Sequence, residues 1–290
     1  MKSIIIYLGI IFLFVGCYNR EKIVDKKKLL GNDYRLFQNT SAWELAKAVE
    51  DGDSLKIEKE ISKKNEIINF QEPRFGSTLL MLTIRNKQYN IFKKLLNLGA
   101  DPNIGDSYDG QTAVICAAKI DEIKYLKLIL KFKGNPNARE DAEYKKENDG
   151  GRQTALLAAI NTYDISSLEK VKLLVNAGAN INYSDEKTSL ALSEALILDR
   201  LDIVLYLLKA GANYNLILYT TEDKEGVYIL EALRRCTLDL NSNQYQKKKE
   251  VITFLKGKGL DYSKEPIPDH ILERIKKNYP KDWSNYIKKY

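Results

Sequence analysis

Two kinds of apolar run alternate along the chain from residue 41 onward. The first kind follows a threonine, as in TLLMLTI from Thr78 and TALLAAI from Thr154. The second is a stripe that stops at a glycine, as in KVKLLVNAG, which ends at Gly178. Apolar positions three and four residues apart line one face of a helix, and a threonine before the run or a glycine after it marks a helix end. The pattern therefore predicts short helices in pairs.

The paired runs recur at a nearly constant spacing. Their threonines are 34, 42 and 34 residues apart, and Gly178 and Gly211 are 33 apart. A fixed period of this size is typical of a solenoid of stacked units. A weaker fifth copy follows, in which Val227 replaces the threonine, so we expect Gly226 to begin its first helix. The four threonines expected to cap helices are Thr78, Thr112, Thr154 and Thr188.

The four clear copies, which start TLLMLTI, TAVICAA, TALLAAI and TSLALSE, resemble the ankyrin repeat, whose unit of about 33 residues begins T-P-L-H-x-A. This chain departs from that pattern at the proline and the histidine, which are replaced by other residues in all four copies. The resemblance implies an all-α ankyrin-repeat solenoid of helix–turn–helix units with N- and C-terminal capping helices.

The resemblance and the flanking patterns suggest domain boundaries. We place the repeat domain at 41–263, with a cap at 41–71, repeats near 76–107, 110–140, 151–185, 186–220 and 226–263, and capping helices at 264–290. Trp43 is expected to face inward in the first cap, and Trp283 is expected to cover the last repeat. Two insertions, 138–152 and 236–249, interrupt the period, and their roles are left open.

The chain begins with an apolar run. Residues 3–18 carry no charge, but sixteen residues are fewer than the roughly 20 that a spanning helix needs. With Lys2 before it and FVGC at its end, the segment resembles a bacterial lipoprotein signal at 1–16, although Phe14 departs from that pattern. The resemblance implies a lipid on Cys17 and a tether at 17–40. An ordinary cleaved signal and an uncleaved anchor are the alternatives.

Charge is unevenly distributed along the chain. The formal net charge is +7, and residues 241–290 contribute +6 of it, with twelve Lys or Arg against six Asp or Glu. Such a tail suggests an acidic surface nearby or a solvated face. Cys116 and Cys236 lie in helical patterns 120 residues apart, which favours buried thiols over a disulfide or a metal site.

The sequence contains no recognisable catalytic constellation. One histidine, His270, excludes most metal and triad arrangements, and no glycine-rich loop follows a strand. We therefore expect no enzyme activity, no metal and no cofactor.

Binding by shape is the alternative to catalysis, and it directs attention to the loop tips between the units. The tips at 104–111, 139–152, 183–187 and 216–225 carry tyrosines, which make large contacts at low entropic cost. Some of these aromatic side chains could instead pack on their own loops. The candidate partner-binding residues are Asp106, Tyr108, Asp109, Tyr144, Arg152, Tyr183, Asp185, Leu218 and Tyr219.

These features suggest a monomeric, lipid-anchored ankyrin-repeat module that binds a protein partner of unknown identity outside the bacterial cytoplasm, in the cell envelope. One alternative is an immunity-type inhibitor of an envelope-acting toxin. Another is a structural envelope protein whose basic C-terminal face contacts anionic lipid or polymer. No nucleic acid is expected as a partner.

Overall fold

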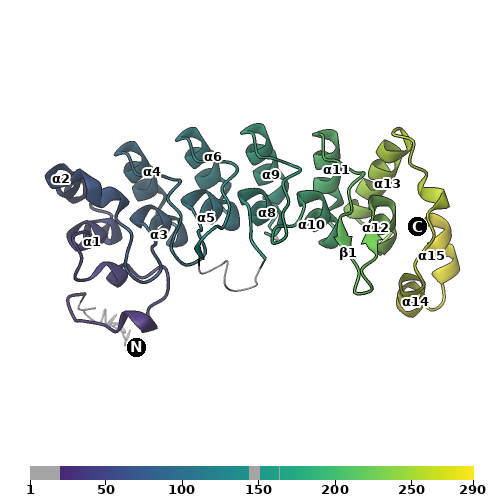
Figure 1. The fold of residues 1–290 in the computed structure, drawn as a ribbon, viewed down its shortest axis with the longest axis horizontal. Helices are drawn as coiled ribbons and strands as arrows, with labels where there is room; N and C mark the ends of the chain where they lie inside the picture. The colour runs from purple at the N-terminus through teal and green to yellow at the C-terminus, as the bar shows by residue number, and fades with distance from the viewer. Residues whose placement is uncertain (1–19, 144–150, 163) are drawn as a thin grey trace, which may run out of the picture.

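The computed structural model describes residues 20–143, 151–162 and 164–290. These residues form an elongated row of helix pairs that runs from one end of the chain to the other (Figure 1). The first helices of the pairs form one row and the second helices form another, parallel row. The pairs are α1 (Trp43–Asp51) with α2 (Ser54–Lys63), α3 (Leu79–Arg85) with α4 (Tyr89–Asn97), α5 (Ala113–Lys119) with α6 (Ile123–Lys131), α8 (Ala155–Ile160) with α9 (Ser167–Asn176), α10 (Ala191–Ile197) with α11 (Leu201–Lys209), and α12 (Ile229–Arg235) with α13 (Asn243–Lys256).

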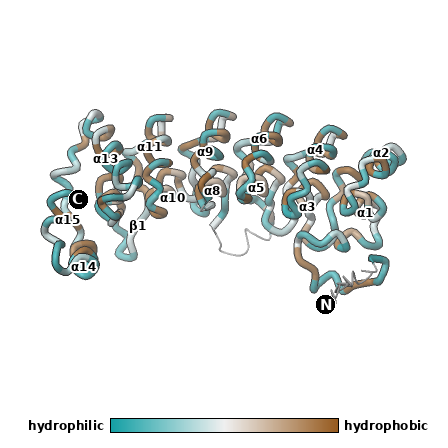
Figure 2. Tube along the Cα trace, turned by 180° about the vertical axis from the view of Figure 1, so that it is seen from behind, coloured by the Kyte–Doolittle hydropathy of each residue, from teal (hydrophilic) through white to brown (hydrophobic). Residues whose placement is uncertain are grey.

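The core lies between the two rows and between neighbouring pairs. The first helices α3, α5, α8 and α10 are buried along almost their whole length. Small residues such as Ala117, Ala118, Ala158 and Ala159 let adjacent helices approach closely. Second helices bury one face only. Figure 2 shows hydrophobic residues where the rows meet and hydrophilic residues on the outward side of the second helices. Within the described residues, no helix combines the length and the apolar character needed to cross a bilayer.

Threonine caps begin three of the first helices, as predicted. The hydroxyls of Thr78, Thr112 and Thr154 accept hydrogen bonds from the backbone N–H three residues on, at 3.4, 3.4 and 3.1 Å. The prediction for Thr188 is wrong, because α10 starts only after Leu190. Thr188 instead pairs through its backbone with Asp185 in a tight turn.

The fifth unit also starts differently from the prediction. Gly226 does not begin a helix, because it lies in β2 (Gly226–Val227), which pairs antiparallel with β1 (Tyr219–Thr220). Helix α12 begins after Tyr228. The hairpin takes up the residues of the tip at 216–225, so the helix starts later.

A ladder of asparagine side chains joins successive units. The Asn137 amide oxygen accepts a hydrogen bond from the Asn180 backbone N–H at 2.7 Å, and its NH2 group donates to the Gly178 carbonyl at 3.1 Å. Asn103 and Asn182 make the same two contacts with the next unit. Each rung satisfies backbone groups that the end of a second helix leaves without a helical partner.

The segment before residue 41 is part of the fold, so its expected role as a tether is wrong for residues 20–40. It contains the 3₁₀-helices η1 (Lys26–Lys28) and η2 (Tyr34–Phe37) and buries Leu36 and Phe37 completely. The Arg20 guanidinium hydrogen-bonds Asp51 at 2.6 Å. Apolar residues in short 3₁₀ turns show no long helical period, which is why the pattern suggested an unstructured segment.

Near the N-terminal end, the 3₁₀-helix η3 (Asn65–Asn69) follows α2.

The C-terminal end closes with two capping helices, α14 (Asp269–Asn278) and α15 (Trp283–Lys289), after the short 3₁₀-helix η4 (Tyr262–Lys264). Trp283 does not cover the last repeat, because its side chain is 39% exposed. The Tyr286 hydroxyl donates to the Leu238 carbonyl at 2.6 Å, so the cap rests on the insertion at 236–249.

Candidate functional site

The loop tips lie along one edge of the solenoid, and buried carboxylates fix the bases of three of them. Counted from the N-terminus, the five tips are 72–77, 104–111, 139–152, 183–187 and 216–225. Glu72 accepts hydrogen bonds from three backbone N–H groups of the first tip, and Asp106 does the same in the second. Glu140 accepts from the Gln153 N–H at 3.1 Å and from Lys119 at 2.9 Å. A buried carboxylate that accepts several N–H bonds holds a loop in one conformation, so Glu72 and Asp106 fix the first two tips and Glu140 fixes the described base of the third.

Neighbouring tips also contact one another. The Ser107 N–H donates to the Phe75 carbonyl at 2.9 Å, and the Arg152 N–H donates to the Lys187 carbonyl at 2.7 Å. Gly110 has a φ of +78°, and a Cβ there would lie 2.3 Å from the backbone nitrogen of Asp141. The second and third tips therefore approach so closely that only glycine fits between them.

Two of the predicted contact residues lie inside the tips. Asp106 is buried and binds the amides of its own loop; burial raises the pKa of its carboxyl, and the Arg85 guanidinium opposes that rise. Leu218 is 6% exposed and packs into the core. Neither side chain faces a partner in this arrangement of the tips. Cys17 and Tyr144 lie outside the described residues.

Tyr183 and Asp185 form a polar cluster with Arg139, which sequence reasoning did not single out. Arg139 binds Asp185 at 2.6 Å and the Tyr183 hydroxyl, and that hydroxyl donates to Asp185 at 2.8 Å. Burial would raise the pKa of Asp185, but hydrogen bonds from the Tyr183 hydroxyl and the Lys187 N–H, together with the Arg139 charge, lower it to about 2. Tyr183 thus packs on its own loop through its polar end.

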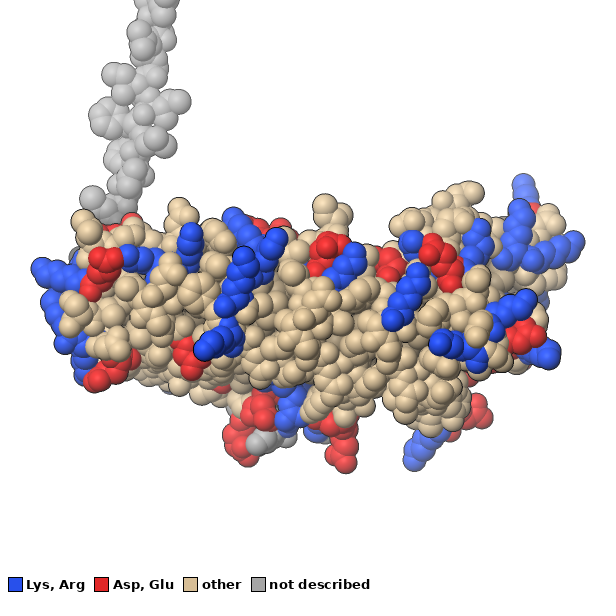
Figure 3. Space-filling view, turned by 90° about the horizontal axis from the view of Figure 1, so that it is seen from above, with Lys and Arg blue, Asp and Glu red and all other residues tan. Residues whose placement is uncertain are grey.

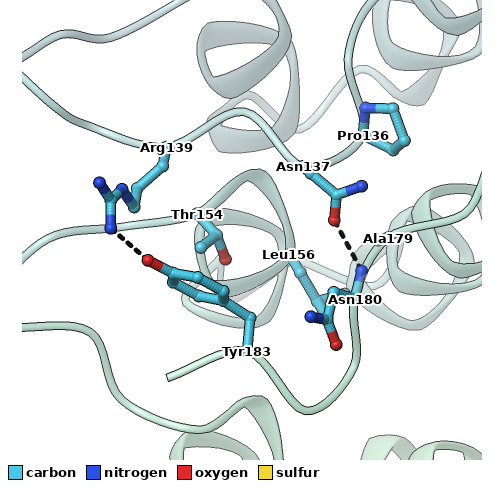
Figure 4. Close-up of a pocket in the computed structure, with 8 residues that line it drawn as sticks. All are labelled: Pro136, Asn137, Arg139, Thr154, Leu156, Ala179, Asn180 and Tyr183. Carbon is cyan, nitrogen blue, oxygen red and sulfur yellow. Dashed lines mark hydrogen bonds between the residues drawn. The ribbon is translucent and has the colours of Figure 1, made fainter. Parts of the chain in front are cut away.

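A hollow of about 440 Å³ lies beside this cluster (Figure 4). Arg139 and Tyr183 close one side of it, and the Asn137–Asn180 rung of the ladder closes the other. Its lining mixes the aliphatic side chain of Leu156 with polar groups. Arg152, another predicted contact, is largely covered and binds Asp141 at 3.1 Å near the same tip.

Two predicted residues of the second tip remain at the surface. Tyr108 is 44% exposed, and its ring edge packs on Phe75 with centroids 5.9 Å apart. Asp109 is half-buried beside it, and its carbonyl accepts from the Ala142 N–H at 3.4 Å. Tyr108 therefore offers part of its ring from a position held by the neighbouring tip.

The β1–β2 hairpin projects beyond the short fourth tip (Figure 1) and stands between two hollows. One hollow, of about 610 Å³, separates the hairpin from the fourth tip, and the other, of about 690 Å³, separates it from His270 and Pro268. Tyr219 lines both. Ile217, at the base of the hairpin, is 49% exposed. The predicted Leu218 and the exposed Ile217 are adjacent, and alternation along the extended chain decides which one faces solvent.

The described residues include no cluster of three or more His, Cys, Asp or Glu side chains that could hold a metal ion. His270 lies 3.3 Å from the Arg235 guanidinium at the surface. The thiols of Cys116 and Cys236 are buried and free, and burial raises the pKa of both.

Comparison with known proteins agrees with this geometry. A family model for ankyrin repeats, three copies long, matches residues 45–141 and 140–217. The "Ankyrin repeat and KH domain-containing protein mask-1" of Caenorhabditis elegans is 29% identical over 179 residues, which are 61% of this chain and 6% of that protein.

A solved structure shows the same fold. The ankyrin repeat domain of Bcl-3, a member of the IkappaB protein family, has 25% sequence identity and a TM-score of 0.54, covering 75% of this chain and 86% of that one. EF0377, an ankyrin repeat protein, has 22% identity and a TM-score of 0.48 over 73% of this chain and 96% of that one. Ankyrin repeat domains are generally non-catalytic modules that bind proteins. With more than half of its length matched by the family model, the chain belongs to the ankyrin repeat family.

Proposed function

We propose that this protein binds one protein partner through the tip edge of the solenoid, centred on the hollow between the fourth tip and the β1–β2 hairpin. The observation that carries the proposal is the exposed apolar side chain of Ile217 at the wall of that hollow. Leu216 beside it is also exposed, and the charged residues Asp185 and Glu186 form the rim. Exposed apolar groups with a polar rim are typical of protein interfaces.

The charge of the tips supports a basic partner surface. By sequence, the tips at 104–111, 139–152, 183–187 and 216–225 carry twelve Asp or Glu and six Lys or Arg, a net charge of −6 in a chain of +7. Complementary potentials speed association and exclude wrong partners. The partner is therefore expected to present an apolar side chain flanked by Lys or Arg.

We further propose that the protein acts at a bacterial membrane, held by a lipid on Cys17. The support is the sequence of the apolar run and its distance from the fold. Only two residues separate Cys17 from Arg20, which binds Asp51, so the fold would lie within about 10 Å of the lipid-bearing residue. Metabolic labelling with a radioactive fatty acid tests this, because Cys17→Ser is expected to abolish incorporation.

An immunity-type inhibitor of an envelope-acting toxin is a narrower form of the same proposal. It predicts a tight complex with a single protein that survives high salt and that blocks the partner's activity. A retained partner without loss of activity would favour a scaffold.

The binding proposal is tested by affinity capture from bacterial envelope extract with the full chain as bait. Ile217→Asp is expected to abolish retention of the partner in high salt. The matched control is Leu55→Asp, which places the same charge on an 80% exposed leucine of α2, away from the tips. Equal retention by both variants would rule out the hollow beside Ile217 as the contact.

A further inference from the structure

The fold sorts charge by side in a way that the linear sequence conceals. The six second helices α2, α4, α6, α9, α11 and α13 carry fifteen basic and five acidic side chains, a net charge of +10. The six first helices carry five of each. The basic surface is thus the whole second-helix row, and not the C-terminal end alone.

Many of these lysines have no acidic partner. Seven lie exposed on the row and form no ion pair within the described part of the chain: Lys59, Lys93, Lys127, Lys131, Lys209, Lys249 and Lys256. Figure 3 looks onto this row from above, and Lys and Arg side chains are spread along its length. Repeated cations held in a line without counter-charges create a positive potential along one side of the molecule.

We propose that the second-helix row docks on an anionic phospholipid bilayer, so that the solenoid lies along the membrane with its tips free to bind a partner. This inference goes beyond the proposed protein binding and does not depend on it. Each lysine near an anionic leaflet contributes to the binding free energy, and salt screens this attraction.

The chemistry of the row favours a bilayer over nucleic acid. All fifteen cationic side chains of the second helices are lysines. None is an arginine, whose planar guanidinium binds a single phosphate through two parallel hydrogen bonds. Among the described residues, Leu55 is the one large apolar side chain of this row that is exposed. The row therefore has no exposed aromatic side chain on which a nucleic-acid base could stack. Diffuse attraction to a continuous charged surface needs neither feature.

The position of the apolar run adds a second argument. Residues 3–18 join the fold at Arg20, which binds Asp51 at the turn between α1 and α2, where the second-helix row begins. A membrane that holds this run would therefore lie at the same end of the solenoid as α2, the first helix of the row.

The test places a fluorescent reporter on each side of the full chain. Asn97→Cys puts the label at the exposed end of α4 in the row, and Ser184→Cys puts it on the fourth tip, both in a Cys17→Ser background because Cys116 and Cys236 are buried. Vesicles contain phosphatidylcholine with or without phosphatidylglycerol, plus a lipid with a nitroxide quencher on its headgroup. We expect several-fold stronger quenching at position 97 than at 184, only with phosphatidylglycerol, and reversed by high salt.

Charge variants separate the row from net charge. The variant that combines Lys93→Gln, Lys127→Gln, Lys131→Gln and Lys209→Gln is expected to abolish the quenching at position 97. The matched control combines Lys187→Gln, Lys224→Gln, Lys264→Gln and Lys288→Gln, which remove the same charge off the row, and it is expected to keep the quenching. The four row lysines are exposed, as are Lys224, Lys264 and Lys288, and an unchanged circular dichroism spectrum verifies the fold of both variants.

Three outcomes would overturn the proposal. Equal quenching at both positions would mean that the chain has no preferred face on the membrane. Loss of quenching in both charge variants would mean that membrane binding depends on the net charge of the protein and not on the lysines of the row. A response of the position 97 label to a short DNA duplex, lost in the row variant and absent with vesicles, would make nucleic acid the occupant.

Discussion

The centre of the solenoid and its two ends are held together in different ways. In the centre, one contact recurs from unit to unit, as in the rungs made by Asn103, Asn137 and Asn182. At the ends, each contact occurs once, as in the Arg20–Asp51 pair and the closing helices. Terminal units of a solenoid must shield a face that the central units cover with a neighbour. The ends therefore depend on particular side chains, and the centre depends on repetition.

The largest expected effect tests whether the N-terminal end is truly part of the domain. Phe37 is fully buried and its ring lies 6.3 Å from that of Phe70. Phe37→Ala should lower the free energy of unfolding by about 3–5 kcal/mol, because it leaves a cavity in a packed core. Urea denaturation measures the change.

The control for this prediction lies in the same segment. Ile23→Ala, at a side chain that is 77% exposed, should change stability by less than about 0.5 kcal/mol. If Phe37→Ala were as mild as Ile23→Ala, residues 20–40 would be a tether after all, and the N-terminal end would begin at residue 41.

The C-terminal end should give the chain a distinctive pH dependence. Lys248 is fully buried with its ammonium 3.5 Å from the Tyr290 ring centre and 3.2 Å from the Cys236 carbonyl. Burial, together with the neighbouring Arg234 charge, lowers the pKa of Lys248 to about 7, although Cys236 and Asp199 oppose the shift.

The sign follows from proton binding. An unfolded lysine has a pKa of about 10.4, so above pH 7 the unfolded chain holds a proton that the folded chain has lost, and stability rises with pH. Between pH 7 and 9 the free energy of unfolding should increase by about 2 kcal/mol from this group. Denaturation at several pH values measures the slope, and Lys248→Met should flatten it. An equal slope in the variant would assign the dependence to another group.

The contrast between centre and ends also explains what the sequence could predict. The helix pairs, their period and three of the four threonine caps follow from local pattern, because each unit repeats the same solution. Residues 20–40 could not be recognised as folded, because Leu36 and Phe37 are buried by 3₁₀ turns and long-range contacts that leave no period. The burial of Lys248 could not be predicted either, because it depends on the aromatic rings that surround the lysine in the folded chain.

The tips were predicted in place but not in orientation. An acid in a turn can face solvent or accept its own loop's N–H groups, and the pattern of Asp106 is the same in both cases. Likewise, Ile217 and Leu218 are neighbours, and only the pairing of Tyr219 with Val227 fixes which side faces the core. Pattern thus locates the loop tips, and side-chain direction requires the fold.

The asparagine ladder should show a difference between a central rung, Asn137, and Asn215, which lies beyond the last rung. Asn137→Ala removes two hydrogen bonds to the next unit and should cost about 1–3 kcal/mol. Asn215→Ala should cost less than about 0.5 kcal/mol, because the Asn215 side chain forms no rung with the following unit within the described residues. Thermal or urea unfolding of both variants checks the difference. Equal losses would mean that the asparagines act within their own loops and not between units.

The smallest effect concerns two threonines that look alike in the sequence. Thr154→Val keeps the shape of the side chain but removes the hydroxyl that accepts from the Leu157 N–H, so it should cost about 1 kcal/mol. Thr188→Val should be close to neutral or slightly stabilising, because the Thr188 hydroxyl caps no helix and is buried. Urea denaturation of the two variants under identical conditions makes the comparison. A loss of about 1 kcal/mol at Thr188 as well would show that α10 starts at the threonine in solution, like the helices of the three preceding units.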